Sequence, residues 1–385
     1  MQPGRQAESA AREAAILARQ RAPHLLDVTR VCACMNFASD NTAGVAPEIM
    51  TALVAGNAGF ALGYGNDDMT RAVEQRIGAI FEREVAVFLV PTGTAANALA
   101  LAHVSPPWGA VFAHAEAHVL TDECGAPEFF GGGLKLVGMP GTGCKIAPET
   151  LAETVAQYEG HAPHQVVPAA FSFAQATEAG TIYRIDEIAA LATIAHAHGM
   201  AVHMDGARFA NALVRMNASP ADAAWRAGVD VLSFGATKGG ALAAEAVVFF
   251  DPARAANMGE RRKRAGHLLS KHRFLALQFA AFLADDCWLR LARHANDMAD
   301  RLAAGLVRAG HVPVWPVEAN LVFIAVPKAV EARLRQAGAR YYVRHSASLP
   351  DGVVLGPDRV LLRLVTSFAT CAEEVDQFVQ VAAKA

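Results

Sequence analysis

The sequence predicts an α/β protein with a mostly parallel, seven-stranded sheet in a large domain and a small α+β domain at the C-terminus. Seven short apolar runs between residues 85 and 250 alternate with helix-like segments, as in parallel α/β sheets. The chain has 385 residues, which is more than a single core usually supports. A charged, proline-containing stretch at 251–271 separates this region from a different pattern near the C-terminus.

Each of the seven apolar runs is short enough for a buried strand. They cover residues 85–90, 110–113, 134–137, 166–173, 200–204, 229–234 and 244–250. Helical spacing is found between them at 94–103, and again in the apolar stripe at residues 188, 191, 192 and 195. We expect Asp186 to cap this second helix and Gly199 to end it. The alternation predicts one sheet with helices on both faces.

The C-terminal region has fewer strands and a long helix. The pattern predicts a helix at 288–309 that ends at Gly310, strands at 319–326 and 360–365, and a last helix at 373–383. The first 34 residues are rich in Ala, Arg and Gln and are typical of one amphipathic helix. We therefore divide the chain into an N-terminal extension (1–34), a large domain (35–270) and a small domain (271–385).

Composition argues against several classes of protein. The net charge is −3 and the pI about 6.5, so no basic surface for nucleic acid is expected. No apolar run reaches the ~18 residues that a membrane helix needs. Six cysteines lack any CxxC or Cys/His spacing. We expect reduced thiols in a cytoplasmic protein, without a metal site or a disulfide framework.

A lysine follows one of the predicted core strands, in the stretch VDVLSFGATKGG. Lys238 lies in the bend between two apolar runs, and stripping water from an ammonium group is costly. One interpretation is a lysine whose charged end reaches the surface. The other is an amine nucleophile held at the edge of the sheet.

Three further features follow other strands. In PTGTAANALA, Gly93 and Thr94 begin a helix whose free N–H groups suit a phosphate, although an ordinary threonine cap fits as well. In DGARFA, Asp205 ends an apolar strand and needs a cationic partner, for which Arg208 is near in sequence. His118 follows the strand at 110–113 and is either a buried structural histidine or a flat ring beside a ligand.

Together these features match the needs of one cofactor. Open α/β sheets bind ligands at the carboxyl ends of their strands. A phosphate site, a buried acid and a lysine at one such edge are the three parts that pyridoxal 5'-phosphate requires.

Seven stretches, in order over nearly the whole chain from about residue 36, carry a family resemblance. They are FASDNTAG, GYGNDD, PTGTAAN, EAHVLTDECGAPEFF, HMDGARFANA, LSFGATKGG and LRLVTS. The chain resembles the threonine aldolases, pyridoxal-phosphate enzymes of fold type I in the aspartate-aminotransferase superfamily. It is most similar to the low-specificity L-threonine or phenylserine aldolases. The resemblance implies a carbon–carbon lyase that cleaves β-hydroxy-α-amino acids to glycine and an aldehyde.

The resemblance also implies roles around the cofactor. Lys238 would form the covalent link, and Asp205 would pair with the pyridine nitrogen. His118 would stack on the ring. The remaining cofactor contacts would come from Gly93 and Thr94 at the phosphate and from Arg208 and Arg264.

Substrate contacts are implied in the same way. Ser39, Arg208 and Arg363 would hold the substrate carboxylate, so the segment 35–60 would contribute to the site of the large domain. Tyr64 would reach the site of a partner subunit, in a homodimer or homotetramer with shared active sites.

One position departs from the family pattern. Some members have a histidine in the loop after the fourth strand, where this chain has QATEAG with Glu178. The base for the substrate hydroxyl is therefore unassigned, with His118 or a bound water as the candidates. Alternative functions are a β-eliminating or β-hydroxyaspartate-specific lyase on the same fold, or a binding protein that has kept the fold.

Overall fold

The structure is a computed structural model that describes residues 35–344, 349 and 353–384. The extension 1–34 and its predicted amphipathic helix lie outside the described residues. Of the cysteines, four fall within the described part: Cys124, Cys144, Cys287 and Cys371. Within this part, no helix is long and apolar enough to cross a membrane.

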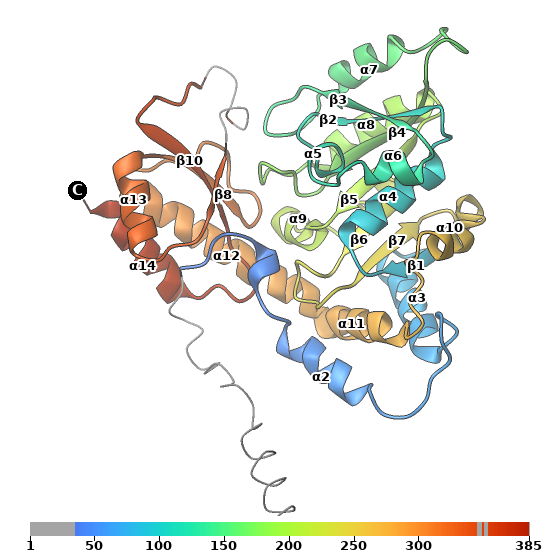
Figure 1. Cartoon of the computed structure of the whole chain (residues 1–385), viewed down its shortest axis with the longest axis horizontal. Helices are drawn as coiled ribbons and strands as arrows, with labels where there is room; N and C mark the ends of the chain where they lie inside the picture. Colours follow the sequence, from blue (N-terminus) through green and yellow to red (C-terminus); the bar gives the residue numbers. More distant parts are fainter. Residues whose placement is uncertain (1–34, 345–348, 350–352, 385) are drawn as a thin grey trace, which may run out of the picture. The chain divides into compact units, whose positions relative to one another are not determined.

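A seven-stranded sheet forms the centre of the larger part of the molecule (Figure 1). Its spatial order is β1-β7-β6-β5-β4-β2-β3. Strand β7 runs antiparallel to its neighbours β1 and β6, and the other pairs are parallel. The predicted mostly parallel sheet is confirmed. The strands are β1 (Ala86–Val90), β2 (Gly109–His114), β3 (Lys135–Met139), β4 (Val167–Ala174), β5 (Ala201–Gly206), β6 (Val231–Gly235) and β7 (Glu245–Phe249).

Helices connect the strands and cover the sheet. They are α2 (Pro47–Ala55), α3 (Asp68–Ile80), α4 (Gly93–Val104), α5 (His118–Thr121), α6 (Ala126–Phe130), α7 (Pro148–Ala156), α8 (Ile185–Ala197), α9 (Phe209–Met216), α10 (Met258–Arg264) and α11 (Arg273–Leu283). The prediction that Asp186 caps α8 is wrong. The helix begins at Ile185, two residues earlier than a cap at Asp186 would give, so Arg184 is the cap, and its backbone N–H donates to the Glu187 carboxylate.

A second, three-stranded antiparallel sheet has the order β8-β10-β9. It consists of β8 (Leu321–Pro327), β10 (Arg359–Val365) and the short β9 (Tyr342–Arg344), which we did not predict. Helices α12 (Cys287–Arg308), α13 (Lys328–Gln336) and α14 (Ala372–Ala383) complete this part. Phe37 lies in its core, because the backbone of Phe37 accepts from Val365 N and donates to Arg340 O. This anchors the segment that carries Ser39.

Hydrophobic packing passes from one core to the other within α12. Trp288 and Leu291, near the start of this helix, belong to the core of the large sheet, whereas Leu302 and Leu306 belong to the core of the small sheet. Helix α11 also packs against the large core. The division of the chain at 270/271 stays a prediction.

Candidate active site

The predicted site residues follow the carboxyl ends of the large sheet's strands. Strands β1 and β6 both run antiparallel to β7 between them, so they point the same way. The ends of β1, β2, β4, β5 and β6 therefore meet at one edge of the sheet, which is where open α/β sheets bind ligands. The residues at or after these ends include Gly93, His118, Glu178, Asp205 and Lys238.

Asp205 is buried at the end of β5. One carboxylate oxygen accepts from the side-chain amide of Asn97 at 2.8 Å, and the other accepts from Ala207 N at 3.0 Å. Burial alone would raise the pKa of Asp205, but the positive charges of Lys238 and His118 outweigh it, and the pKa is lowered. The carboxyl group is therefore ionised and suited to hold a cationic ring nitrogen.

Arg208 does not pair with Asp205, contrary to our prediction. Its guanidinium instead forms a bidentate ion pair with Asp40, with Nε–Oδ2 2.8 Å and Nη2–Oδ1 3.0 Å. Asn320 donates a further bond to Asp40 at 3.2 Å. The charge of Asp205 is satisfied locally by the Asn97 amide and the backbone, so Arg208 is not needed there.

Lys238 lies in the bend after β6. Ala244 N donates to the Thr237 hydroxyl at 3.1 Å and closes this bend. The positive charge of Lys238 acts to lower the pKa of both Asp205 and Asp40, so the ammonium group lies near enough to both carboxylates to influence them. This position favours an amine held at the edge of the sheet over a lysine whose charged end reaches the surface.

The start of helix α4 offers a phosphate site. The Thr92 side chain caps the helix by accepting from Ala95 N at 3.1 Å. The amides of Gly93 and Thr94, in the first turn, have no acceptor within the helix. A Cβ built at Gly93 would meet no described atom within 4 Å, so the approach to these amides is open.

Within one chain, Arg264 lies away from the start of helix α4. It is exposed on α10 and lines a surface depression with Ala102 and Phe130. Ala102 lies nine residues along α4 from Gly93, about 13 Å at the usual helical rise. A role for Arg264 at the phosphate stays a prediction.

His118 is connected to Asp205 by a chain of hydrogen bonds. Its Nδ1 lies 2.9 Å from Oε1 of Glu123, and the Asn97 amide donates to Glu123 and to Asp205, at 2.8 Å each. The hydrogen bond with Glu123 raises the pKa of His118, and burial raises the pKa of Glu123. The contact of Nδ1 with Glu123 thus fixes the orientation of the ring and leaves Nε2 for a ligand.

Arg363 has a buried nitrogen, Nε, without a hydrogen-bond partner among the described residues. Burial, with the neighbouring charge of Arg208, lowers the pKa of Arg363 to about 10. A buried N–H group without an acceptor is costly, so this side chain suits a substrate carboxylate that would accept from it. Ser39 lies next to Asp40 in the chain and caps the short helix η2 (Asp40–Thr42).

A cavity of about 270 Å³ adjoins the site. Phe323, which lines it, is directly opposite Arg363 in the β8–β10 register, so both side chains lie on one face of the small sheet. Glu178 lines the cavity from the other side and accepts from His118 N at 2.9 Å. The remaining lining residues are His114, Glu116, Thr121, Asp122, Gly141, Thr142, Gly143, Cys144, Ala179, Trp315, Arg344 and Leu349.

Tyr64 lies apart from the other predicted residues. Its side chain is half exposed, and Lys263 Nζ lies 4.6 Å from the centre of its ring. Nearby on the same segment, Phe60 and Leu62 are also exposed. This arrangement leaves the tyrosine on the surface of the single chain.

Sequence reasoning missed three residues that hold the site together: Asp40, Asn97 and Glu123. Each lies inside a stretch that carries the family resemblance, respectively FASDNTAG, PTGTAAN and EAHVLTDECGAPEFF. Asn97 gave a signal, because it is the one polar residue in the apolar run 95–102. Asp40 and Glu123 lie among other polar residues and gave none. Their partners lie up to 168 residues away in the chain, which no local pattern reveals.

Comparison with known proteins agrees with this geometry. The family model of the beta-eliminating lyases matches residues 36–329. The chain belongs to this family. A low-specificity L-threonine aldolase of Pseudomonas aeruginosa is 42% identical over 308 residues, which cover 80% of this chain and 88% of that protein. A second, from a Pseudomonas species, is 40% identical over 80% of this chain and 88% of that protein. The predicted resemblance to threonine aldolases is confirmed, and with it a carbon–carbon lyase.

Solved structures support the fold. A threonine aldolase of Leishmania major superposes with a TM-score of 0.84 at 29% identity, covering 90% of this chain and 98% of that one. A serine palmitoyltransferase of Sphingomonas wittichii gives a TM-score of 0.65 at 16% identity, over 98% of this chain and 95% of that one. The second likeness concerns the fold alone. The predicted fold type I architecture is confirmed.

Proposed function

We propose that this protein cleaves β-hydroxy-α-amino acids, such as L-threonine, L-allo-threonine or phenylserine, to glycine and an aldehyde with pyridoxal phosphate. One observation carries the proposal: Lys238 and the buried carboxylate of Asp205 lie at one edge of the sheet, where the charge of the lysine acts on the carboxylate. Two relatives that carry the name low-specificity L-threonine aldolase support it.

The described residues fit pyridoxal phosphate. Lys238 would hold its aldehyde carbon, Asp205 its protonated ring nitrogen, and the amides of Gly93 and Thr94 its phosphate, while His118 would lie against the ring. The unpaired buried Nε of Arg363 supports an anionic substrate beside it. When bound, this cofactor withdraws electrons from the α-carbon of an attached amino acid.

The chain's own residues would then choose the bond that breaks. Arg363 would grip the carboxylate through charge-assisted hydrogen bonds, and Ser39 would support this end of the substrate. Arg208, held by Asp40, is less available and would act mainly by its charge. Fixing the carboxylate fixes the rotation about the α-carbon, so the bond to the β-carbon is presented for cleavage.

We also infer an assembly with shared sites. Tyr64, Phe60 and Leu62 are exposed on one segment, which suits an interface with a second copy. A homodimer or homotetramer would let Tyr64 reach the site of a partner subunit. The cysteine pattern of the sequence favours a cytoplasmic location.

Product analysis tests the proposed reaction. The purified protein, loaded with pyridoxal phosphate, is incubated separately with threonine, allo-threonine and phenylserine. We expect glycine and the matching aldehyde in equal amounts. Ammonia and a keto acid instead would identify an eliminating lyase, the alternative that the family description favours. If none of the β-hydroxy amino acids gave a product, both the aldolase and the eliminating lyase would be contradicted.

A further inference from the structure

The loop after β4 is held rigidly, and it carries Glu178. Gly180 N donates to Thr177 O at 2.9 Å, which forms a tight turn with Glu178 at its corner. Gly180 has a φ of +79°, and a Cβ there would lie 2.8 Å from Leu321 Cβ, so the turn needs glycine. The Thr177 and Thr181 hydroxyls both donate to Gly143 O, at 3.1 and 2.6 Å.

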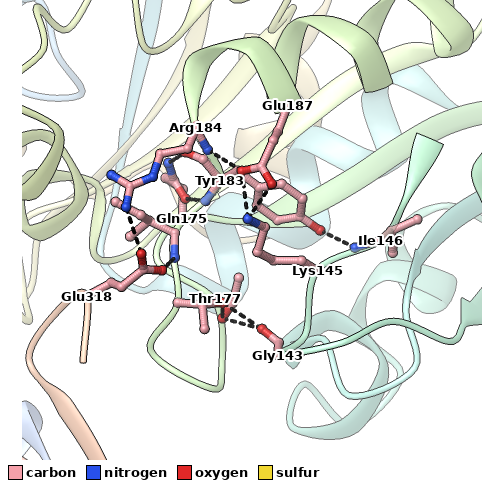
Figure 2. A network of polar contacts seen from close by, with 11 residues as sticks. Gly143, Lys145, Ile146, Gln175, Thr177, Tyr183, Arg184, Glu187 and Glu318 are labelled. Carbon is pink, nitrogen blue, oxygen red and sulfur yellow. Dashed lines mark hydrogen bonds and ion pairs between the residues drawn. The ribbon is translucent and has the colours of Figure 1, made fainter. Parts of the chain in front are cut away.

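A network of side chains braces both ends of this loop (Figure 2). The Gln175 amide donates to Tyr183 O at 2.8 Å and accepts from Tyr183 N at 3.0 Å. The Tyr183 hydroxyl accepts from Ile146 N at 2.8 Å, and Glu318 pairs with Arg184 at 2.7 Å. A side chain on a loop fixed in this way is suited to precise chemistry.

Glu178 stands between the site and the cavity. Oε1 accepts from His118 N, on the side of the site, and the side chain also lines the cavity that Phe323 bounds from the small sheet. Phe323 shares its face with Arg363. An amino acid whose carboxylate is held by Arg363 would therefore extend its side chain past Glu178 into this cavity.

We propose that Glu178 is the catalytic residue that takes the proton of the substrate's β-hydroxyl group during carbon–carbon cleavage. This rests on the proposed function. The O–H bond breaks as Glu178 takes the proton, the β-carbon forms its carbonyl, and the electron pair of the broken carbon–carbon bond stays on the α-carbon. The α-carbon later gains one proton, and Glu178 returns its proton to solvent, so the step needs no further reactant.

The electrostatic surroundings support this role. Burial is the largest cause that raises the pKa of Glu178, to about 7, so the group exchanges protons near neutral pH, as a general base should. The hydrogen bond to Glu123 raises the pKa of His118, so a larger share of this ring already carries a proton and cannot take another. The titratable and charged groups around Glu178 include His114, Glu116, His118, Asp122, Cys144, Tyr183, Asp205 and Arg344.

The test uses Glu178→Gln in the loaded, full-length enzyme. Glutamine keeps an oxygen that can accept from His118 N, so folding should be preserved. We expect kcat for phenylserine cleavage to fall about 10²- to 10⁴-fold with little change in KM. Exchange of the α-proton of glycine in D2O should continue at the wild-type rate, because glycine has no β-hydroxyl. Glu178→His should recover part of the lost cleavage.

A second readout does not depend on turnover. In cofactor-free protein with ¹³C-labelled glutamate, NMR should find a carboxyl group that titrates near neutral pH and is missing in Glu178→Gln. Glu74→Gln is the matched control, since burial also raises the pKa of Glu74, on α3, and its cleavage rate should equal wild type.

The outcomes separate the two proposals. Wild-type protein that releases no glycine from any substrate overturns the proposed function and this inference together. Wild-type protein that cleaves phenylserine while Glu178→Gln keeps the same kcat and pH profile overturns the role of Glu178 alone. Equal loss of cleavage and of glycine exchange would also overturn it, because the residue would then act on the α-carbon chemistry or on the fold.

Discussion

Arg208 and Asp40 form a buried bidentate ion pair that joins the N-terminal segment to the loop after β5, 168 residues away. The side chains are only 10% and 1% exposed. Asn320, which precedes β8, donates to the same carboxylate. Asp40 thus connects three parts of the site. It also pairs with Arg208, which the family resemblance assigned to the substrate carboxylate.

Removing Asp40 should destabilise the protein strongly. Asp40→Ala leaves the guanidinium of Arg208 buried without its partner, which costs about 3–5 kcal/mol in the free energy of unfolding. Urea unfolding of the purified protein measures this. Asp222→Ala, which removes an exposed pair with Arg226 and a hydrogen bond with Ser219, is the control and should change stability by about 1 kcal/mol or less. Equal losses in the two variants would contradict the prediction.

The stabilisation from Asp40 should depend on pH with a definite sign. Arg208 and Lys238 hold the folded-state pKa of Asp40 below its ordinary value of 3.8, against the effect of burial. The unfolded chain therefore binds more protons in acid, and stability falls as pH drops below about 4. The difference in stability between wild type and Asp40→Ala should be full at neutral pH and shrink toward pH 2.

Replacing Arg363 should separate stability from substrate binding. The buried Nε has no partner, so Arg363→Met should leave the ligand-free protein as stable or up to about 1–3 kcal/mol more stable. The same change removes the proposed carboxylate contact, and the KM should rise by about 30-fold or more. Thermal melting and steady-state kinetics measure the two effects. Arg359→Met, an exposed position on the same strand, should change neither.

Apolar periodicity was sufficient to predict the large sheet. Each of the seven predicted runs overlaps an observed strand, because strands buried on both faces are nearly continuous in Val, Phe and Ala. Strand β9 escaped prediction because all three of its residues are exposed, so no apolar pattern marks it. The cap of α8 was misplaced by two residues because Arg184 gives no ordinary capping signal.

The site was predicted in part. Lys238, Asp205, Gly93 and His118 follow strand ends, and parallel topology alone brings such residues to one edge. The pairings among them could not be predicted in the same way. Arg208 is three residues from Asp205 in the chain, yet its partner is Asp40, because the segment docked by Phe37 on the small sheet brings that carboxylate within reach.

Lys238→Ala should abolish both turnover and the covalent link to the cofactor. The reason is that Lys238 is the lysine whose charge acts on Asp205. After borohydride reduction of the loaded protein, mass spectrometry should find the added cofactor mass on the peptide that contains Lys238 in wild type and not in the variant. Lys145→Ala, which removes an ion pair with Glu187, should keep the link. A modified peptide elsewhere would refute the assignment of Lys238.

Glu123 should control the charge of His118. Its hydrogen bond is the main cause that raises the pKa of His118 above 6.5. Glu123→Gln removes the carboxylate that accepts this hydrogen bond. Burial of the ring then has the larger effect, so the pKa of His118 should fall to 6.5 or below. The pH titration of the His118 ring proton by NMR measures the change. Glu116→Gln is the control, because Glu116 acts on His114 rather than on His118.

The same variant should alter the pH dependence of stability. A histidine whose folded pKa is raised stabilises the protein fully below its unfolded pKa of 6.5 and loses this contribution as pH rises through the folded value. The raised pKa of the buried Glu123 acts in the same direction, because ionising it in the folded state is costly. Wild type should therefore exceed Glu123→Gln in stability most at low pH, with the difference falling as pH rises. A difference that grows with pH would mean that Glu123 does not hold the proton of His118.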